Sequence, residues 1–221
     1  MRALHAAIAA ALLLPAGAAR ADGAAFLRFG SVWIVDRGYD LFSTVDATPQ
    51  VLVGGGWGVD ERVDLELAWA FAGSSAQSFG TIDARFFLHQ IQGAANVRLA
   101  GSELLGLGAR GGAALAIARA DVDGAGAAGT IEDTAFGLGL EGTLVAELRV
   151  PMGFDGSPDA AALGLSVEAG YGWHPFGYAF DDARLELDED RRPRPTAPGP
   201  IALGTLDPSG PILRFGVALH F

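Results

Sequence analysis

This sequence of 221 residues lacks cysteine, lysine and long apolar runs. Without cysteine, an exported chain must hold its fold without disulfide bonds. All 15 basic residues are arginine; against 26 Asp and Glu they give a formal net charge of −11. Because phosphate binding needs a basic surface, this charge argues against a nucleic-acid partner. Beyond residue 21, no stretch approaches the roughly 18 apolar residues of a transmembrane helix, which excludes membrane-spanning helices there.

Residues 1–21 predict a secretory signal peptide. Arg2 supplies the positive start, and residues 6–14 (AAIAAALLL) are apolar but too short to span a bilayer as a helix. Residues 19–21 (ARA) form a small-x-small cleavage site. Cleavage would leave residues 22–221 as one mature domain. It would also remove two arginines and change the net charge from −11 to −13.

Apolar residues recur at every second position along the mature chain. Half of all residues are hydrophobic and 32 are glycine, a composition that disfavours long helices. In residues 163–173 (LGLSVEAGYGW), the odd positions are apolar, whereas the even positions are Gly, Ser or Glu. Residues 136–150 and 63–71 repeat this pattern. The period predicts β-strands with one apolar face and one face of small or charged residues.

Eight segments of this kind follow one another. They span residues 25–35, 48–58, 62–72, 86–99, 104–119, 132–150, 161–175 and 210–221. Long connections at 36–47, 73–85, 120–131 and 176–209 alternate with tight turns at 59–62 and 100–103 and an intermediate connection at 151–160. This layout is typical of bacterial outer-membrane barrels. We therefore expect an all-β fold, an eight-stranded antiparallel up-and-down transmembrane β-barrel with both termini in the periplasm.

Alternation alone leaves open which face points outward, because a soluble lipocalin-like barrel has the same period. Here the non-apolar face is mostly Gly and Ala with a few charges, which suits the narrow interior of an eight-stranded barrel. Aromatic residues near the strand ends favour interfacial girdles. The expected outer girdle contains Trp33, Trp69, Phe71, Phe136, Tyr171 and Trp173, and the inner one Trp57 and Phe221. The lipid-facing residues should include Leu138, Leu140, Leu165 and Val167, with Leu140 near the middle of the bilayer.

The last eight residues, RFGVALHF (214–221), resemble the carboxy-terminal signal of outer-membrane proteins. Its polar, glycine, hydrophobic and terminal aromatic positions are Arg214, Gly216, Leu219 and Phe221. The mature chain is similar to the small eight-stranded barrels of the OmpA, OmpX or OmpW type, with no motif that selects one subfamily. The resemblance implies a monomer in the outer membrane that contacts its lipid and lipopolysaccharide. It also implies recognition of these four residues by the barrel-assembly machinery, for which strand augmentation is a plausible physical basis.

The resemblance implies a non-enzymatic envelope protein with a structural or surface-interaction role. Eight strands leave no wide lumen, which argues against a general-diffusion porin. Unpaired charges in a narrow interior are costly, so the inward charges should pair as a polar plug. These charges are Glu66, Arg98, Arg110, Glu141, Glu147, Arg149, Glu168 and Arg214. A gated, narrow path for small solutes is the alternative interpretation.

A lipid-modifying barrel enzyme is a third hypothesis, which needs a nucleophile and a base close together near the outer leaflet. The histidines of the mature chain are His89, His174 and His220. His174 is followed by Pro-Phe, without a serine two residues on. His89 is preceded by a segment that contains Ser74, Ser75, Ser78 and Asp83. We predict no catalytic and no cofactor-binding residue.

One stretch matches part of a metal-binding motif. Residues 121–132 (DVDGAGAAGTIE) place Asp121, Asp123, Gly126 and Glu132 at positions 1, 3, 6 and 12 of a calcium loop. Position 5 is alanine, and the flanking segments are predicted strands where the motif needs helices. A flexible glycine-rich hairpin loop is the better interpretation, so we predict no metal site.

The pattern also predicts one contact inside the barrel. The fifth and sixth segments form a hairpin centred near residues 125–126, so the numbers of cross-strand partners should sum to about 251. On this register, Arg110 lies opposite Glu141 on the inward face. We therefore expect an arginine–carboxylate ion pair in the lumen.

Overall fold

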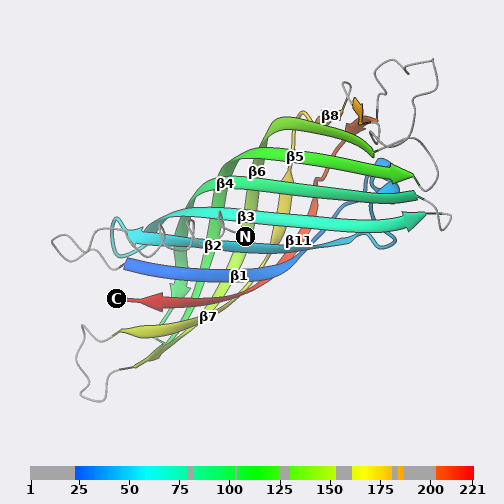
Figure 1. Ribbon diagram of the computed structural model, residues 1–221. Coiled ribbons are helices and arrows are strands. Elements are labelled where there is room, and N and C mark those ends of the chain that lie inside the picture. The colour runs from blue at the N-terminus through cyan, green and yellow to red at the C-terminus, as the bar shows by residue number, and fades with distance from the viewer. Residues whose placement is uncertain are drawn as a thin grey trace, which may run out of the picture.

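In a computed structural model of the protein, eight long antiparallel strands form a closed barrel (Figure 1). The described residues are 23–78, 82–102, 104–124, 130–152, 161–180, 184–186 and 203–221. The barrel strands are β1 (Gly23–Trp33), β2 (Ala47–Gly58), β3 (Val63–Ser78), β4 (Ile82–Gly101), β5 (Leu105–Gly124), β6 (Thr130–Pro151), β7 (Ala162–Trp173) and β11 (Gly210–His220). The expected signal peptide, residues 1–21, and the charged, Pro-rich segment 188–200 lie outside the described residues.

The barrel closes because the last strand returns to the first. Each barrel strand pairs with the next one along the chain, and β11 pairs with both β7 and β1. At this seam, Gly23 and Phe221 exchange two backbone hydrogen bonds of 2.8 and 2.9 Å. Closure satisfies backbone groups of both end strands, as a structure that spans a bilayer requires. The predicted fold class, an eight-stranded antiparallel transmembrane β-barrel, is confirmed.

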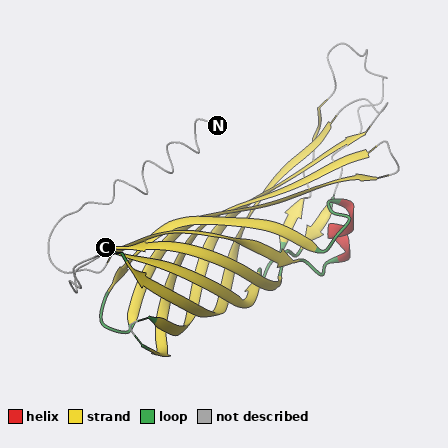
Figure 2. Cartoon of the chain, turned by 90° about the horizontal axis from the view of Figure 1, so that it is seen from below, coloured by secondary structure: helices red, strands yellow, loops and turns green. Residues whose placement is uncertain are grey.

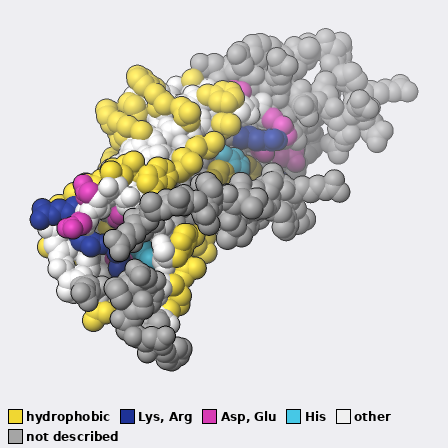
Figure 3. Space-filling model, turned by 90° about the vertical axis from the view of Figure 1, so that its left-hand side faces the viewer, with side chains coloured by type: hydrophobic (Ala, Val, Ile, Leu, Met, Phe, Trp, Pro, Cys, Tyr) yellow, Lys and Arg dark blue, Asp and Glu magenta, His cyan; other side chains and the backbone are white. Residues whose placement is uncertain are grey.

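The direction of the two faces also agrees with the prediction. Leu138, Leu140, Leu165 and Val167 point outward and are 43–48% exposed. Glycine, alanine and charged side chains point inward, as in β5, where Ala114, Ala116 and Ala118 are buried. Hydrophobic side chains form a broad outer surface, and charged groups gather toward the ends (Figure 3). A soluble barrel would bury the large apolar face, so the lipocalin-like alternative is wrong.

Four strands are longer than predicted. β3 to β6 contain 16, 20, 20 and 22 residues, whereas the other barrel strands contain 11 or 12. Most of residues 73–85 and 120–131, predicted as long loops, therefore continue these strands, and this prediction was wrong. Their polar sequence breaks the apolar alternation, but the backbone still pairs, with Ser75 opposite Arg85 and Asp121 opposite Glu132. The continued strands project beyond the barrel as an extension (Figure 2).

Short elements cover the same end of the barrel. They are the 3₁₀ helix η1 (Arg37–Leu41), β8 (Tyr178–Phe180), β9 (Arg184–Glu186) and β10 (Gly204–Leu206). β8 and β10 form a small two-stranded sheet, and β9 pairs with the outer end of β6. All four lie in segments predicted as connections. No helix among the described residues is long and apolar enough to cross a membrane.

Candidate functional site

Each barrel strand contributes a long polar side chain to the middle of the lumen. Three are arginines, three are glutamates and two are glutamines. They are Arg28 (β1), Gln50 (β2), Glu66 (β3), Gln92 (β4), Arg110 (β5), Glu141 (β6), Glu168 (β7) and Arg214 (β11). Their formal charges cancel, so these six ionised groups together carry no net charge.

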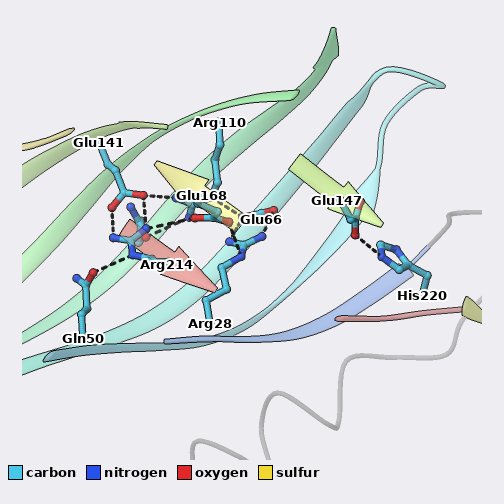
Figure 4. Close-up of polar contacts among 10 residues, drawn as sticks. Arg28, Gln50, Glu66, Arg110, Glu141, Glu147, Glu168, Arg214 and His220 are labelled. Atoms are coloured by element: carbon cyan, nitrogen blue, oxygen red, sulfur yellow. Dashed lines mark hydrogen bonds and ion pairs between the residues drawn. The ribbon is translucent and has the colours of Figure 1, made fainter. Parts of the chain in front are cut away.

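The six charged side chains form a closed cycle in which arginine and glutamate alternate, here called the charge ring (Figure 4). Arg28 contacts Glu66 through Nη2 at 2.7 Å and Glu168 through Nε at 2.8 Å. Arg110 continues from Glu66 with an Nε–Oε2 distance of 2.7 Å and also contacts Glu141.

Arg214 completes the cycle. It contacts Glu141 at 2.5 Å and Glu168 at 3.6 Å. Every member of the charge ring therefore has two partners of opposite charge. Two amide side chains extend the ring, because Gln50 accepts a hydrogen bond from Arg214 Nε at 2.8 Å and Gln92 accepts one from Arg110 Nη2 at 3.1 Å.

The charge ring is deeply buried, which determines its energetics. Arg214 and Glu168 are fully shielded from solvent, and Arg110 is 2% exposed. Removing two such charges from water is costly, and their attraction offsets this cost only when both partners are present. The ring is therefore strongly sensitive to the loss of any single member.

Small residues on neighbouring strands make room for the long side chains. A Cβ atom at Gly216 would lie 3.1 Å from Cγ of Arg28 and 2.3 Å from Oγ of Ser166. Glycine at this position thus lets the Arg28 side chain cross the seam between β1 and β11. This is a structural reason for Gly216, separate from its place in the predicted assembly signal.

The predicted contact between Arg110 and Glu141 is confirmed, although the predicted register is wrong by two residues. Arg110 lies opposite Thr143, and Glu141 lies opposite Gly112, so partner numbers sum to 253. A shift of two keeps both residues on the inward face, and the long arginine side chain covers the offset. The pair also belongs to a larger network, which the sequence pattern of one hairpin does not reveal.

The charge ring contains one residue that the sequence analysis missed. Arg28 alternates with the outward residues Leu27 and Phe29, but the large inward residues Phe26 and Val32 obscure the pattern of this strand. The prediction of a paired polar plug is confirmed for Glu66, Glu168 and Arg214 as well as the Arg110–Glu141 pair. Arg98 is an exception, because it takes part in none of the ion pairs among the described residues.

A second polar group lies nearer the termini. His220 Nε2 contacts Oε1 of Glu147 at 2.8 Å, and Arg149 Nε donates to Oε2 of the same carboxylate at 2.9 Å. Gly164 on the strand between them leaves the necessary space, since a Cβ there would lie 2.6 Å from Glu147 Oε1. This group links β11 to β6 across β7.

The other half of the lumen is filled mainly by apolar side chains. Phe86 packs edge-on against Tyr39 of η1 at 5.7 Å between ring centroids, and it also contacts Phe42. Tyr178 and Phe180 of β8 are 0–1% exposed and belong to the same core. On this side of the charge ring, the described short elements therefore fill the barrel as a core fills a soluble protein.

The candidate catalytic groups are not brought together. His89 points outward, stacks on Trp69 and makes a tilted contact with Phe71. Ser74 lies on the inner face, where it accepts a hydrogen bond from the Tyr39 hydroxyl. His174 is buried beside Gln90, with 3.1 Å between Nε2 and the amide nitrogen. This arrangement offers no nucleophile with an adjacent base among these residues.

The two ends of the partial calcium motif lie in strands, residues 121–124 in β5 and 130–132 in β6, and residues 125–129 lie outside the described residues. Asp121 and Glu132 lie opposite each other on β5 and β6, and both contact Arg119, at 2.7 and 2.8 Å. Within the described part of the chain, no group of three or more His, Asp or Glu side chains is arranged to hold a metal ion.

Comparisons with known proteins give a likeness of fold. No protein-family model and no curated protein matches this sequence. The crystal structure of Ail, the attachment invasion locus protein of Yersinia pestis, has 11% sequence identity and a TM-score of 0.52 over 92% of this chain and 100% of that one. Ail in complex with the heparin analogue sucrose octasulfate gives a TM-score of 0.50, with the same identity and coverage.

A further similar structure is Neisserial surface protein A (NspA), with 14% identity and a TM-score of 0.47 over 93% of this chain and 99% of that one. Together with the closed barrel, the outward apolar face and the paired charges inside, the likeness to Ail defines the class of this protein. The chain is a small eight-stranded β-barrel of the outer-membrane type.

Proposed function

We propose that this chain is an integral outer-membrane protein, without enzymatic activity, that presents the extension of β3 to β6 at the cell surface as an interaction site. The extension is the observation that carries the proposal. It projects from the barrel end opposite the termini, and its four strands run beyond the level at which β7 ends (Figures 1 and 2). With periplasmic termini, this end faces outward.

The surface of the extension supports a role in water. Asp83, Arg85, Arg119 and Thr134 are exposed on it, whereas the outward residues closer to the membrane, such as Ile117, are apolar. The inner side of the extension packs on η1 and β8. Packing of this kind holds the extension as a fixed surface, which lowers the entropic cost of binding a partner.

The interior supports a non-channel role. The charge ring crosses the lumen with fully buried members, and the apolar core fills the half beyond it. A solute would have to separate paired, desolvated charges and then displace packed side chains. The narrow channel is therefore disfavoured.

The similar structure of Ail, named for attachment and invasion, supports surface attachment as the type of role. We do not extend the binding of a sulfated saccharide to this chain. The described charges on the extension include Asp83, Asp121, Asp123 and Glu132 against Arg85 and Arg119, and Arg119 is already paired with two carboxylates. A polyanion would meet repulsion there, so we propose a partner that is neutral or basic on its contact surface.

Epitope insertion tests the proposed placement. A tag between residues 79 and 81, which connect β3 and β4, should bind antibody on intact cells. A matched tag in the turn at 59–62 should bind only after the outer membrane is permeabilised. Heat-modifiable gel migration of both variants shows that each barrel has folded. The reverse labelling pattern, or a tagged chain that fractionates as a soluble protein, contradicts the proposal.

A further inference from the structure

The half of the lumen nearer the termini is hollow. A cavity of about 480 Å³ opens at this end of the barrel, and Arg28 and Glu66 of the charge ring line its inner limit. Small inward residues such as Gly56 and Ala218 create the space. Its volume lies in the range of sites that bind small molecules. Because packed side chains fill the barrel beyond the charge ring, the cavity is a blind recess accessible from one side.

Several charges on the strands that line this recess are neutralised by protein partners. Arg28 and Glu66 belong to the charge ring, and Glu147 contacts His220 (Figure 4). Arg149 also pairs with Glu147. Asp60, Glu61 and Arg62 lie in the exposed turn at its mouth, and two charges of opposite sign on the strands themselves also differ from the paired ones. Asp64 on β3 and Arg98 on β4 line the cavity, and neither forms an ion pair within the described part of the chain.

An amide with an unpaired oxygen lies beside both charges. Asn96 is the cross-strand partner of Asp64, and Arg98 follows it two residues later on the same face of β4. The Asn96 Oδ1 atom is shielded from solvent and has no hydrogen-bond partner among the described residues. Gly108 leaves space for this amide, since a Cβ there would lie 2.8 Å from Oδ1. Buried polar atoms without a partner are uncommon, because each costs free energy.

The backbone next to Arg98 is also irregular. The register between β4 and β5 shifts between Arg98 and Ala100, which marks a β-bulge or a similar irregularity. Bulges redirect side chains and are over-represented at barrel rims and beside functional sites. One short wall of the recess therefore combines a carboxylate and a guanidinium that attract each other without ion-pair contact, and an unpaired amide oxygen.

We propose that this recess binds a small zwitterion of the dipeptide class. The ammonium group of the ligand lies at Asp64, its carboxylate at Arg98, and its peptide group at the amide of Asn96. Asp64 lies level with Asn96 on the neighbouring strand, so Asp64 and Arg98 are offset by two residues, about 6.6 Å along the strand direction, which is close to the span of an extended dipeptide. A ligand with one charge would leave either Asp64 or Arg98 unpaired, so the site selects for both charges.

Isothermal titration calorimetry on the folded mature barrel in detergent tests this site. The probe is L-alanyl-L-alanine at millimolar concentration, and the control ligand is the same dipeptide acetylated at its amino end and amidated at its carboxyl end. We expect saturable binding of the free dipeptide and no binding of the capped one. Asp64→Asn and Arg98→Gln should each weaken binding by about tenfold or more, which corresponds to about 1.4 kcal/mol.

A matched control separates the site from general charge effects. Arg85→Gln removes an exposed arginine from the extension at the opposite end and should leave dipeptide binding unchanged. Heat-modifiable gel migration shows that each variant is folded. Absence of saturable binding to the unmodified barrel overturns the proposal, as does equal binding of the capped dipeptide or unchanged affinity in both cavity variants.

A second experiment, co-sedimentation with peptidoglycan, identifies the source of the zwitterion. If the barrel also sediments with purified peptidoglycan that carries free stem peptides, the ligand is part of the cell wall; binding of the free dipeptide alone identifies a soluble peptide. The recess and the extension lie at opposite ends of the barrel. Failure of dipeptide binding thus leaves the proposed surface role intact, and inverted epitope labelling leaves the dipeptide site intact.

Discussion

Single residues in the charge ring differ from surface charges of the same type because water cannot replace a lost partner. Arg110 contacts Glu66 and Glu141 at 2% exposure, whereas Arg119 contacts Asp121 and Glu132 on the extension with its side chain 47% exposed. The two arginines have the same number of carboxylate partners. Their surroundings differ, and this difference separates their contributions to stability.

Substitution of these two arginines tests this difference. Arg110→Met should lower the free energy of unfolding by roughly 3–5 kcal/mol, because it leaves two buried carboxylates each with one cation. Arg119→Met should change it by at most about 1 kcal/mol. Urea unfolding in lipid vesicles, followed by tryptophan fluorescence, measures the change in the free energy of unfolding for both variants. Equal effects of the two substitutions would show that the ring is not a buried network.

The ring also changes what is expected of a double substitution. If Arg110 and Glu141 formed an isolated pair, replacing both with apolar residues would be mild. Glu141 also contacts Arg214, so the double variant leaves Glu66 and Arg214 with one partner each. We expect the Arg110→Met, Glu141→Met double variant to remain clearly destabilised, with a non-zero coupling energy in a double-mutant cycle.

At the scale of an element, β6 passes through two environments. Its inner part, Leu140 to Pro151, pairs with β7, whereas its outer part pairs with β9 and belongs to the extension. Sequence alternation placed Leu140 near the middle of the bilayer. The register places it opposite Trp173, the last residue of β7, so the middle of the paired stretch lies nearer Leu144, which is 65% exposed.

Arginine substitutions along β6 test this placement. Leu144→Arg should cost about 2–4 kcal/mol of stability, and Leu140→Arg should cost less because it lies closer to an interface. Thr134→Arg, on the exposed part of the extension, serves as the control and should have little effect. Equilibrium unfolding in lipid vesicles gives all three values. A larger cost at position 134 than at 144 would contradict the assigned membrane boundary.

At the scale of the whole molecule, the last strand has a structural role that is separate from its resemblance to an assembly signal. β11 closes the barrel against β1, and it carries Arg214 of the charge ring and His220 of the group at the recess. The terminal Phe221 is 69% exposed at the inner end, where its backbone pairs with Gly23. Its ring lies against Gly23 and is otherwise exposed.

Substitution of Phe221 separates recognition from folding. We predict that Phe221→Ser lowers the yield of barrel in the outer membrane of cells, while refolding of the purified chain into detergent changes little. Leu219→Ser changes a second outward-facing residue of the same predicted signal and is measured in the same two assays. Normal yield of both variants in cells would remove the argument that these residues are read by the assembly machinery.

The sequence by itself determined the number of barrel strands, the approximate bounds of most of them and the direction of their faces. These features follow from local alternation, which is a property of each strand alone: Leu165 and Val167 face outward because they alternate with small or polar residues. The long extension was missed because Ser75 and Asp121 interrupt the apolar pattern, although cross-strand backbone pairing continues through them.

The tertiary structure alone decided the register, the place of Arg28 and the closure of the charge ring. A shift of two residues between strands keeps every side chain on its face, so alternation cannot distinguish Arg110 opposite Glu141 from Arg110 opposite Thr143. The ring needs strands far apart in sequence, with Arg28 on β1 held by Glu168 on β7 across the closing seam. Such contacts exist only once the barrel has closed, because closure brings these strands around one lumen.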